Sequence, residues 1–139
     1  MRDAAPIHAC CVAIAGRGVL IAGPSGAGKS DLSLRLIDRG AVLVSDDYTT
    51  LARDGDRLLA EPPATIAGRI EVRGVGIVAL PHVAPVPVVL YIAAADAPPR
   101  LPTADTIDLH GVSVAYAALA LREASAPLKV ELLMARIAS

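Results

Sequence analysis

The sequence lacks tryptophan and phenylalanine, and tyrosine occurs at only three positions. A core without large aromatic rings must be packed from Ala, Val, Leu and Ile, which suits closely spaced layers of sheet and helix. Charged residues are also scarce, at 19% against 54% hydrophobic residues, and this composition excludes a disordered chain. Because 139 residues are too few for two ordinary domains, we expect a single domain over residues 1–139.

Neither sign of charge is in excess, since 13 basic residues stand against 14 acidic ones and the net charge is −1. This balance predicts no nucleic acid and no anionic membrane as a partner. Cysteine is limited to Cys10 and Cys11, which are adjacent, a spacing that strains a mutual disulfide and offers no paired metal site. We interpret both as small buried residues of a cytoplasmic protein, since no signal peptide is evident.

The longest uncharged stretch, residues 74–95, is long enough to span a bilayer. Its three prolines interrupt a helix, so we interpret it as two buried strands and a turn. Elsewhere, β-branched runs and helical spacing predict two helices and further strands, with residues 66–76 as a loop. This mixture predicts an α/β fold, a mixed sheet with several antiparallel strands flanked by few helices. Strands are expected at 7–15, 18–22, 41–44, 48–52, 57–60, 77–80, 86–93, 106–109 and 112–116, and helices at 29–39 and 127–137.

The strongest functional signal is a segment that fits the phosphate-loop pattern G-x-x-x-x-G-K-[ST]. Its glycines allow successive backbone N–H groups to face phosphate oxygens, and the helix that follows adds the positive end of its dipole. Lys29 would place its charge on the β- and γ-phosphates, while the Ser30 hydroxyl would ligate magnesium. We therefore predict a P-loop fold that binds ATP and Mg²⁺. The predicted nucleotide-binding residues are Gly23, Pro24, Ser25, Gly26, Ala27, Gly28, Lys29 and Ser30.

A second signal is the pair Asp46 and Asp47, which directly follows a predicted strand. In an α/β sheet this edge faces the phosphate site, where a carboxylate can hold magnesium or accept a proton from an attacking hydroxyl. Because strand side chains alternate, we expect the two aspartates to point different ways and to divide these roles. His8, Glu71 and Arg73 carry little information singly, since each is equally compatible with a surface position.

In this order, the motifs resemble the catalytic domain of the bacterial HPr kinase/phosphorylase family. That family has a histidine fifteen residues before a loop of the form G-x-S-G-x-G-K-S, as His8 precedes Gly23 here. A helix ending in R-G and a strand ending in D-D follow, matched by Arg39-Gly40 and Asp46-Asp47. The family signature E-[IV]-R-G-[LV]-G-I is matched by residues 71–77, so the resemblance covers about the first 80 residues.

The resemblance implies an ATP- and Mg²⁺-dependent protein serine kinase that phosphorylates the phosphocarrier HPr of the sugar phosphotransferase system. It implies that Ser30 and Glu71 ligate magnesium and that Asp47 accepts the proton. The chain resembles the short, single-domain form of the family, and the family's hexamers imply a homo-oligomer. The implied catalytic residues are His8, Lys29, Asp46, Asp47 and Arg73.

The sequence departs from the family pattern after Ile77. Residues 78–82 replace a glycine-rich stretch that ends in a functional arginine, and residues 124–129 contain no P-x-x-G-R-N loop. That loop is tied to phosphorolysis in the family, so phosphorolysis by this chain is doubtful. Arg100 or Arg122 could supply the cation that the missing arginine would have provided. Two alternatives stay open, a non-catalytic module that senses ATP and a kinase for a small metabolite.

Overall fold

A computed structural model describes residues 4–101 and 105–137 of the chain. Within these residues, no helix has both the length and the apolar character needed to cross a membrane. The strands and helices are β1 (Ala4–Ile7), β2 (Ala9–Ile14), β3 (Arg17–Ala22), α1 (Lys29–Asp38), β4 (Val42–Ser45), β5 (Thr49–Asp54), β6 (Arg57–Glu61), the 3₁₀ turn η1 (Ala64–Ile66), β7 (Arg69–Val72), β8 (Gly76–Ala79), β9 (Val86–Ala94), β10 (Asp105–Leu109), β11 (Val112–Leu119) and α2 (Ala126–Arg136).

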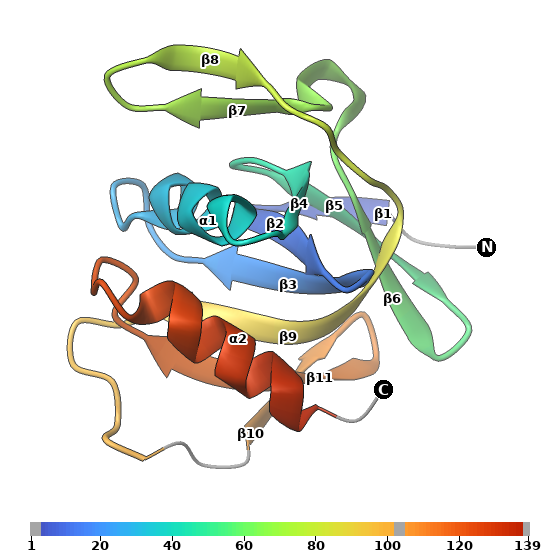
Figure 1. Cartoon of the computed structure of the whole chain (residues 1–139). Coiled ribbons are helices and arrows are strands. Elements are labelled where there is room, and N and C mark those ends of the chain that lie inside the picture. Colours follow the sequence, from blue (N-terminus) through green and yellow to red (C-terminus); the bar gives the residue numbers. More distant parts are fainter. Residues whose placement is uncertain (1–3, 102–104, 138–139) are drawn as a thin grey trace.

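Most strands belong to one mixed sheet, and α1 and α2 lie together on one face of it (Figure 1). Its main path runs β1-β5-β6-β9-β3-β2-β4. The central strand β9 pairs in parallel with β3, and it pairs with β6 near its start and with β11 over its second half. These pairings confirm the predicted mixed sheet with several antiparallel strands and few helices.

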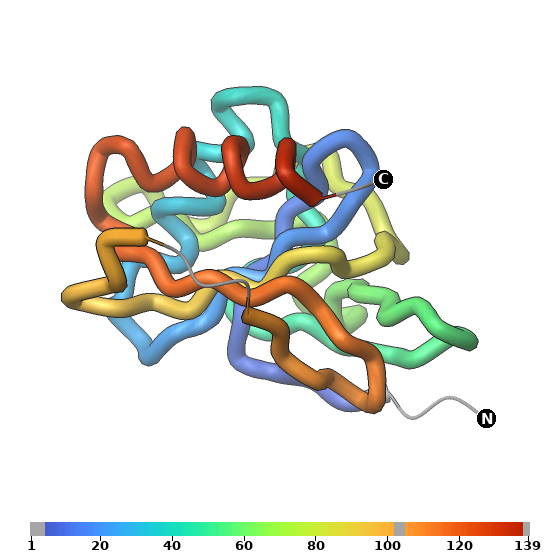
Figure 2. The backbone as a smooth tube through the Cα atoms, turned by 90° about the horizontal axis from the view of Figure 1, so that it is seen from below, coloured from blue at the N-terminus to red at the C-terminus, as the bar shows by residue number. Residues whose placement is uncertain are grey.

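Hydrophobic side chains on the two faces of the sheet form two separate cores. Leu36 of α1 and Met134 of α2 pack against the sheet residues of the first core, while Leu20 and Leu51 belong to the second. Figure 2 shows from a perpendicular direction that α2 runs across one side of β9 and β11. Successive strand residues point alternately into the first and the second core. In the absence of large aromatic rings, small aliphatic side chains fill both cores.

Residues 66–76 do not form the loop that the sequence predicts. β7 and β8 pair antiparallel as a hairpin, and residues 73–75 form its turn. Along β7 the side chains alternate, since Ile70 is buried while Arg69 and Glu71 are exposed. Gly74 adopts a φ of 86° in the turn, where a left-handed residue is needed. The glycines therefore mark the end of a strand, and the prediction failed because they suggested that the whole segment was irregular.

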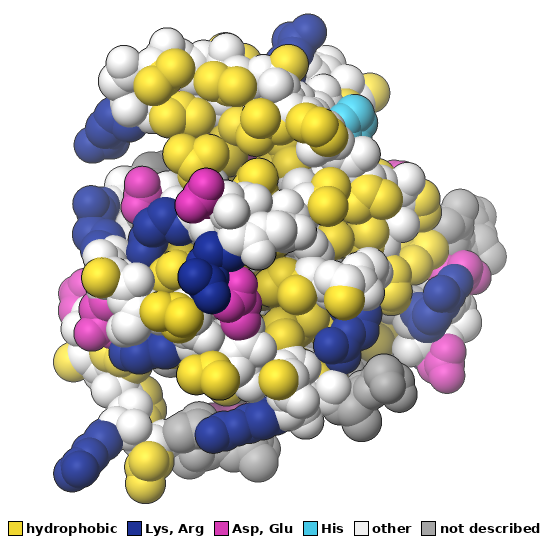
Figure 3. Space-filling view, in the orientation of Figure 1, with side chains coloured by type: hydrophobic (Ala, Val, Ile, Leu, Met, Phe, Trp, Pro, Cys, Tyr) yellow, Lys and Arg dark blue, Asp and Glu magenta, His cyan; other side chains and the backbone are white. Residues whose placement is uncertain are grey.

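The interpretation of residues 74–95 as two buried strands is wrong for the first strand. β9 is buried at alternate positions, as expected, but β8 pairs with β7 in a separate two-stranded sheet and lies apart from the main sheet (Figure 1). Ile77 on β8 is 72% exposed, and Val75 in the turn is 74% exposed. The space-filling view shows hydrophobic side chains gathered over this hairpin (Figure 3). Hydrophobicity alone could not separate a core strand from this exposed one.

Candidate functional site

Three strand ends meet at one edge of the sheet. β2 runs antiparallel to both of its neighbours, and the register pairs Ala9 with Ala22 of β3 and Cys11 with Ser45 of β4. The beginning of β2 therefore lies beside the ends of β3 and β4. As a result His8, the loop of residues 23–28 and Asp46 converge, although they are far apart in the sequence.

A cleft of about 990 Å³ opens between this edge and the β7–β8 hairpin. His8 does not line the cleft but reaches it through Asp47. Of the phosphate-loop pattern, Gly23, Pro24 and Ala27 lie outside the lining and shape the loop instead. The predicted site residues that line the cleft are Ser25, Gly26, Gly28, Lys29, Ser30, Asp46, Asp47, Glu71 and Arg73.

The loop between β3 and α1 is compact because glycine occupies its tight positions. A Cβ atom at Gly23 would lie 2.7 Å from the Cβ of Ala94, so only glycine allows the loop to pass this close to the end of β9. Gly28 has a φ of 101° and is the residue that caps the start of α1. The Lys29 Nζ donates to the carbonyl oxygens of Gly23 and Pro24 at 2.8 and 3.1 Å. The ammonium group is thereby held inside the loop, at the helix N-terminus, where the dipole favours anions.

Asp46 is buried and accepts hydrogen bonds from three different elements. Its Oδ1 accepts the hydroxyl of Ser30 at 2.5 Å and the thiol of Cys10 at 3.3 Å. Its Oδ2 accepts the backbone N–H of Glu71 at 2.9 Å. Burial raises the pKa of the Cys10 thiol to about 11, so the sulfur keeps its proton at neutral pH and donates it. Asp46 thus joins α1, β2 and the β7–β8 hairpin around the cleft.

Asp47 has a different environment from its neighbour. Its φ is 69°, and Tyr48 donates its backbone N–H to the Asp46 carbonyl at 2.8 Å, so Asp47 is the central residue of a γ-turn. The side chain is 58% exposed, and its Oδ1 lies 3.0 Å from the His8 Nε2. The His8 ring stacks on Tyr48 with centroids 5.1 Å apart. The aspartates do diverge, but the cause is this turn after β4 rather than alternation along a strand.

The cleft offers hard oxygen donors of the kind that magnesium prefers. Ser30 donates its proton to Asp46, which leaves the lone pairs of the hydroxyl oxygen available, and the Glu71 carboxylate lies in the cleft wall. Across residues 4–101 and 105–137, no cluster of three or more His, Cys, Asp or Glu side chains is arranged to hold a metal. Mg²⁺ is usually bound by one or two protein groups together with waters and substrate phosphates. These residues fit a cation that binds with a nucleotide.

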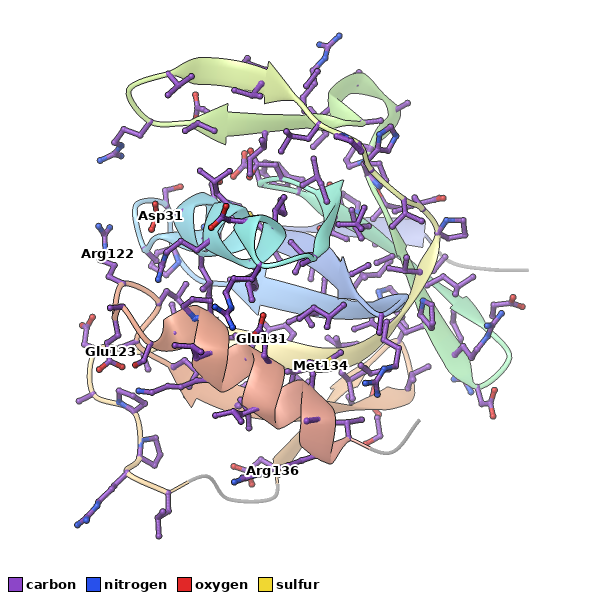
Figure 4. All side chains as sticks on the ribbon, in the orientation of Figure 1. Asp31, Arg122, Glu123, Glu131, Met134 and Arg136 are labelled. Atoms are coloured by element: carbon purple, nitrogen blue, oxygen red, sulfur yellow. The ribbon has the colours of Figure 1, made fainter. Side chains whose placement is uncertain are left out.

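Of the two arginines named as sources of the missing cation, Arg122 lines the cleft and Arg100 does not. Arg35 of α1 donates to the carbonyl oxygens of Leu121 and Glu123 at 2.5 and 2.9 Å and so fixes the backbone on both sides of Arg122. Figure 4 shows the labelled Arg122 beside the loop that precedes α1. The bond from Arg35 to the Leu121 carbonyl joins residues 86 positions apart, so no local pattern in the sequence could have revealed it.

Cys10 is a site residue that the sequence analysis missed, since it was interpreted only as a small buried residue. Its Sγ lies 3.8 Å from the Ser30 Oγ and also bonds to both aspartates. Both cysteines are free and buried, as predicted. A signal was available, because Cys10 follows His8 by two residues and strand alternation places such residues on the same face.

The fold and the cleft define the class of protein. It is a mixed-sheet domain, mostly strands with two helices, whose polar cleft lies where a glycine-containing loop enters α1. Within this class, the chain belongs to the HPr serine kinase C-terminal domain family, whose model matches residues 1–84.

Individual relatives agree with this assignment. The HPr kinase/phosphorylase of Clostridium acetobutylicum is 44% identical over 75 residues, which are 54% of this chain and 25% of that protein. The HPr kinase/phosphorylase of Mycoplasmopsis pulmonis is 39% identical over 72 residues, which are 52% of this chain and 23% of that protein. The chain therefore spans about a quarter of the length of these curated relatives.

A solved structure extends the likeness to the rest of the chain. The Hpr(Ser) kinase/phosphatase from Coxiella burnetii has 31% sequence identity and a TM-score of 0.83, with 94% of each chain covered. The shared fold thus continues well beyond the first 80 or so residues that carry the sequence motifs.

Proposed function

We propose that this chain is an ATP- and Mg²⁺-dependent protein serine kinase whose substrate is the phosphocarrier HPr of the sugar phosphotransferase system. The observation that carries the proposal is the convergence of Lys29, the Ser30–Asp46 pair and the exposed carboxylate of Asp47 in one cleft. Membership of the HPr serine kinase C-terminal domain family supports the choice of substrate.

In the proposed reaction, the serine hydroxyl oxygen of HPr forms a bond to the γ-phosphorus of ATP. The bond from that phosphorus to the oxygen bridging it to the β-phosphorus breaks, so the products are phosphoserine and ADP. The proton of the hydroxyl goes to the carboxylate of Asp47, which is exposed to the cleft. Asp46 is less suited to this role because it is buried and both of its oxygens already accept hydrogen bonds.

The other cleft residues have separate roles in this proposal. Lys29 and the loop N–H groups hold the phosphates, while Ser30 and Glu71 hold Mg²⁺. When bound, the cation neutralises charge on the transferred phosphoryl group. His8 orients Asp47 through the 3.0 Å contact, and Arg73 in the cleft wall adds positive charge near the phosphates. Every predicted catalytic residue has a role in this proposal. Asp47 accepts the proton, while Asp46 holds the Ser30 hydroxyl and the Glu71 backbone in place.

The proposal is tested by incubating the protein with Mg²⁺-ATP and HPr from the same organism. We expect HPr to gain the mass of one phosphate by intact-mass measurement, and we expect chelation of Mg²⁺ to prevent the gain. HPr with its acceptor serine changed to alanine is the matched control. Measurable ATP binding without transfer at millimolar ATP would instead support the ATP-sensing module, and transfer to a small hydroxyl compound but not to HPr would support the metabolite kinase.

Arg122 is expected to contribute to phosphate transfer. Its removal takes away one cation at the edge of the cleft, so we predict that Arg122→Ala lowers kcat/KM for ATP by about tenfold. Arg100→Ala is the matched control, because Arg100 is exposed and lies outside the cleft lining. Steady-state kinetics compare the two variants, and an equal effect of both would contradict a specific role for Arg122.

Three expectations from the sequence remain predictions. The single-domain organisation of residues 1–139 and the doubtful phosphorolysis activity both await measurement. A homo-oligomer is supported by the exposed Val75 and Ile77 on the β7–β8 hairpin, since an exposed apolar surface of this kind can be buried between subunits.

A further inference from the structure

The thiol of Cys10 lies between the two adjacent aspartates and bonds to both. Its Sγ donates to the Asp46 Oδ1 and accepts the backbone N–H of Asp47, each at 3.3 Å. Cys10 itself is completely buried. One side chain on β2 therefore contacts the side chain of one aspartate and the backbone of the other.

The bond to the Asp47 backbone matters because of the conformation of that residue. A φ of 69° is uncommon for any residue other than glycine, and a γ-turn of this hand is seldom formed. Such a conformation persists when its surroundings hold it in place. The N–H of Asp47 is directed at the Cys10 sulfur, and without an acceptor there a partly buried backbone donor would be left unpaired.

His8 and Cys10 hold Asp47 at two different points. His8 directly precedes β2 and contacts the Asp47 carboxylate, while Cys10, two residues later on β2, accepts the Asp47 N–H. The direction of the Asp47 carboxylate is thus set both by the γ-turn of its backbone and by the contact between its Oδ1 and the His8 ring. An aliphatic residue at position 10 would fill similar space but would leave only the contact from His8.

We infer that Cys10 is a positioning residue, whose thiol holds the γ-turn at Asp47 and so directs the Asp47 carboxylate into the cleft. The importance of this direction for phosphate transfer rests on the proposed kinase function. Since the thiol acts through Asp47 and does not contact the phosphates in this role, its loss should affect turnover more than ATP binding.

The adjacent Cys11 provides an unusually close control. It is also completely buried, but it faces the opposite core, and its Sγ donates to the Val12 carbonyl at 3.9 Å. Cys10→Val and Cys11→Val therefore make the same chemical change at neighbouring, equally buried positions. Only the first removes a hydrogen-bond partner from the two aspartates.

We expect Cys10→Val to lower kcat for HPr phosphorylation by about 10-fold to 100-fold, as a small misplacement of a catalytic group does. The KM for ATP should stay within about twofold of the wild-type value. Cys11→Val should retain the wild-type kcat, and Cys10→Ser should recover part of the loss because its hydroxyl can still donate and accept. Equal kcat values for the two valine variants would overturn the inference.

A second measurement tests the positioning without any catalytic turnover. The Asp47 amide should exchange its hydrogen with solvent faster in Cys10→Val than in wild type or Cys11→Val, as followed by NMR. Unchanged exchange would overturn the inference. If the wild-type protein transfers no phosphate to HPr, the proposed function fails while the exchange rates still decide the role of Cys10. If Cys10→Val does not fold, the same comparison is made with Cys10→Ala and Cys11→Ala.

Discussion

Replacement of Asp47 by asparagine is expected to lower phosphate transfer to HPr by about 1,000-fold, because the amide cannot accept the proton of the serine hydroxyl. Asparagine has nearly the same shape and also tolerates a positive φ, so the γ-turn at this position should persist. Its amide oxygen can still face the His8 ring. Because Asp47 contributes no group to the phosphate loop, ATP binding should remain within about twofold of wild type.

The effect of Asp47→Asn is measured by intact mass of HPr over time, with ATP binding followed by calorimetry. Asp56→Asn is the matched control, since Asp56 is an exposed aspartate in the β5–β6 turn, away from the cleft. A variant at Asp47 that transfers phosphate at the wild-type rate would show that this carboxylate is not the proton acceptor. The same measurement on Asp46→Asn would then test its neighbour, although that change also disturbs the contacts with Ser30 and Glu71.

Replacement of Lys29 by alanine is expected to lower kcat/KM for ATP by about 1,000-fold. The Lys29 ammonium lies within the loop at the N-terminus of α1, where its charge would act directly on the phosphates. Its Nζ donates to the carbonyl oxygens of Gly23 and Pro24, which hold the ammonium group within the loop. Both ATP affinity and turnover should therefore fall, in contrast to the result expected for Asp47→Asn.

The chain contains only two lysines, and the second provides the control. Lys129 lies on α2 and pairs with Glu123 at 2.9 Å, outside the cleft. Lys129→Ala should leave ATP binding and transfer unchanged, while thermal unfolding shows whether either variant is destabilised. Wild-type ATP affinity in Lys29→Ala would contradict phosphate binding by this loop and would remove the main support for the proposed kinase.

The location of the cleft could be predicted from the sequence because local chemistry marks it. A glycine pattern before a helix requires a particular loop, and the pair Asp46 and Asp47 directly follows a buried strand. Each signal lies within about ten residues of chain. Their meeting at one edge follows from the general rule that adjacent strands bring their ends together, which the register of β2 with β3 and β4 bears out.

The β7–β8 hairpin could not be predicted from local sequence patterns. Alternation along β7 was present in the sequence, but short strands separated by glycines are difficult to distinguish from a loop. Its position over the cleft depends on contacts with distant residues, such as the bond from the Glu71 N–H to Asp46. The prediction that Glu71 and Arg73 belong to the site therefore came from the family resemblance and not from the physical pattern.

By itself the sequence determined the class of fold, the loop at the start of α1 and the two carboxylates after β4, because these depend on local backbone preferences and on alternation. Only the tertiary structure decided how the two aspartates divide, with one buried under three hydrogen bonds and the other exposed in a γ-turn. It also placed Arg122, and not Arg100, in the lining of the cleft, and it placed the Cys10 thiol between the aspartates. The physical reason is that burial and hydrogen bonding at this cleft are set by groups that only folding brings together.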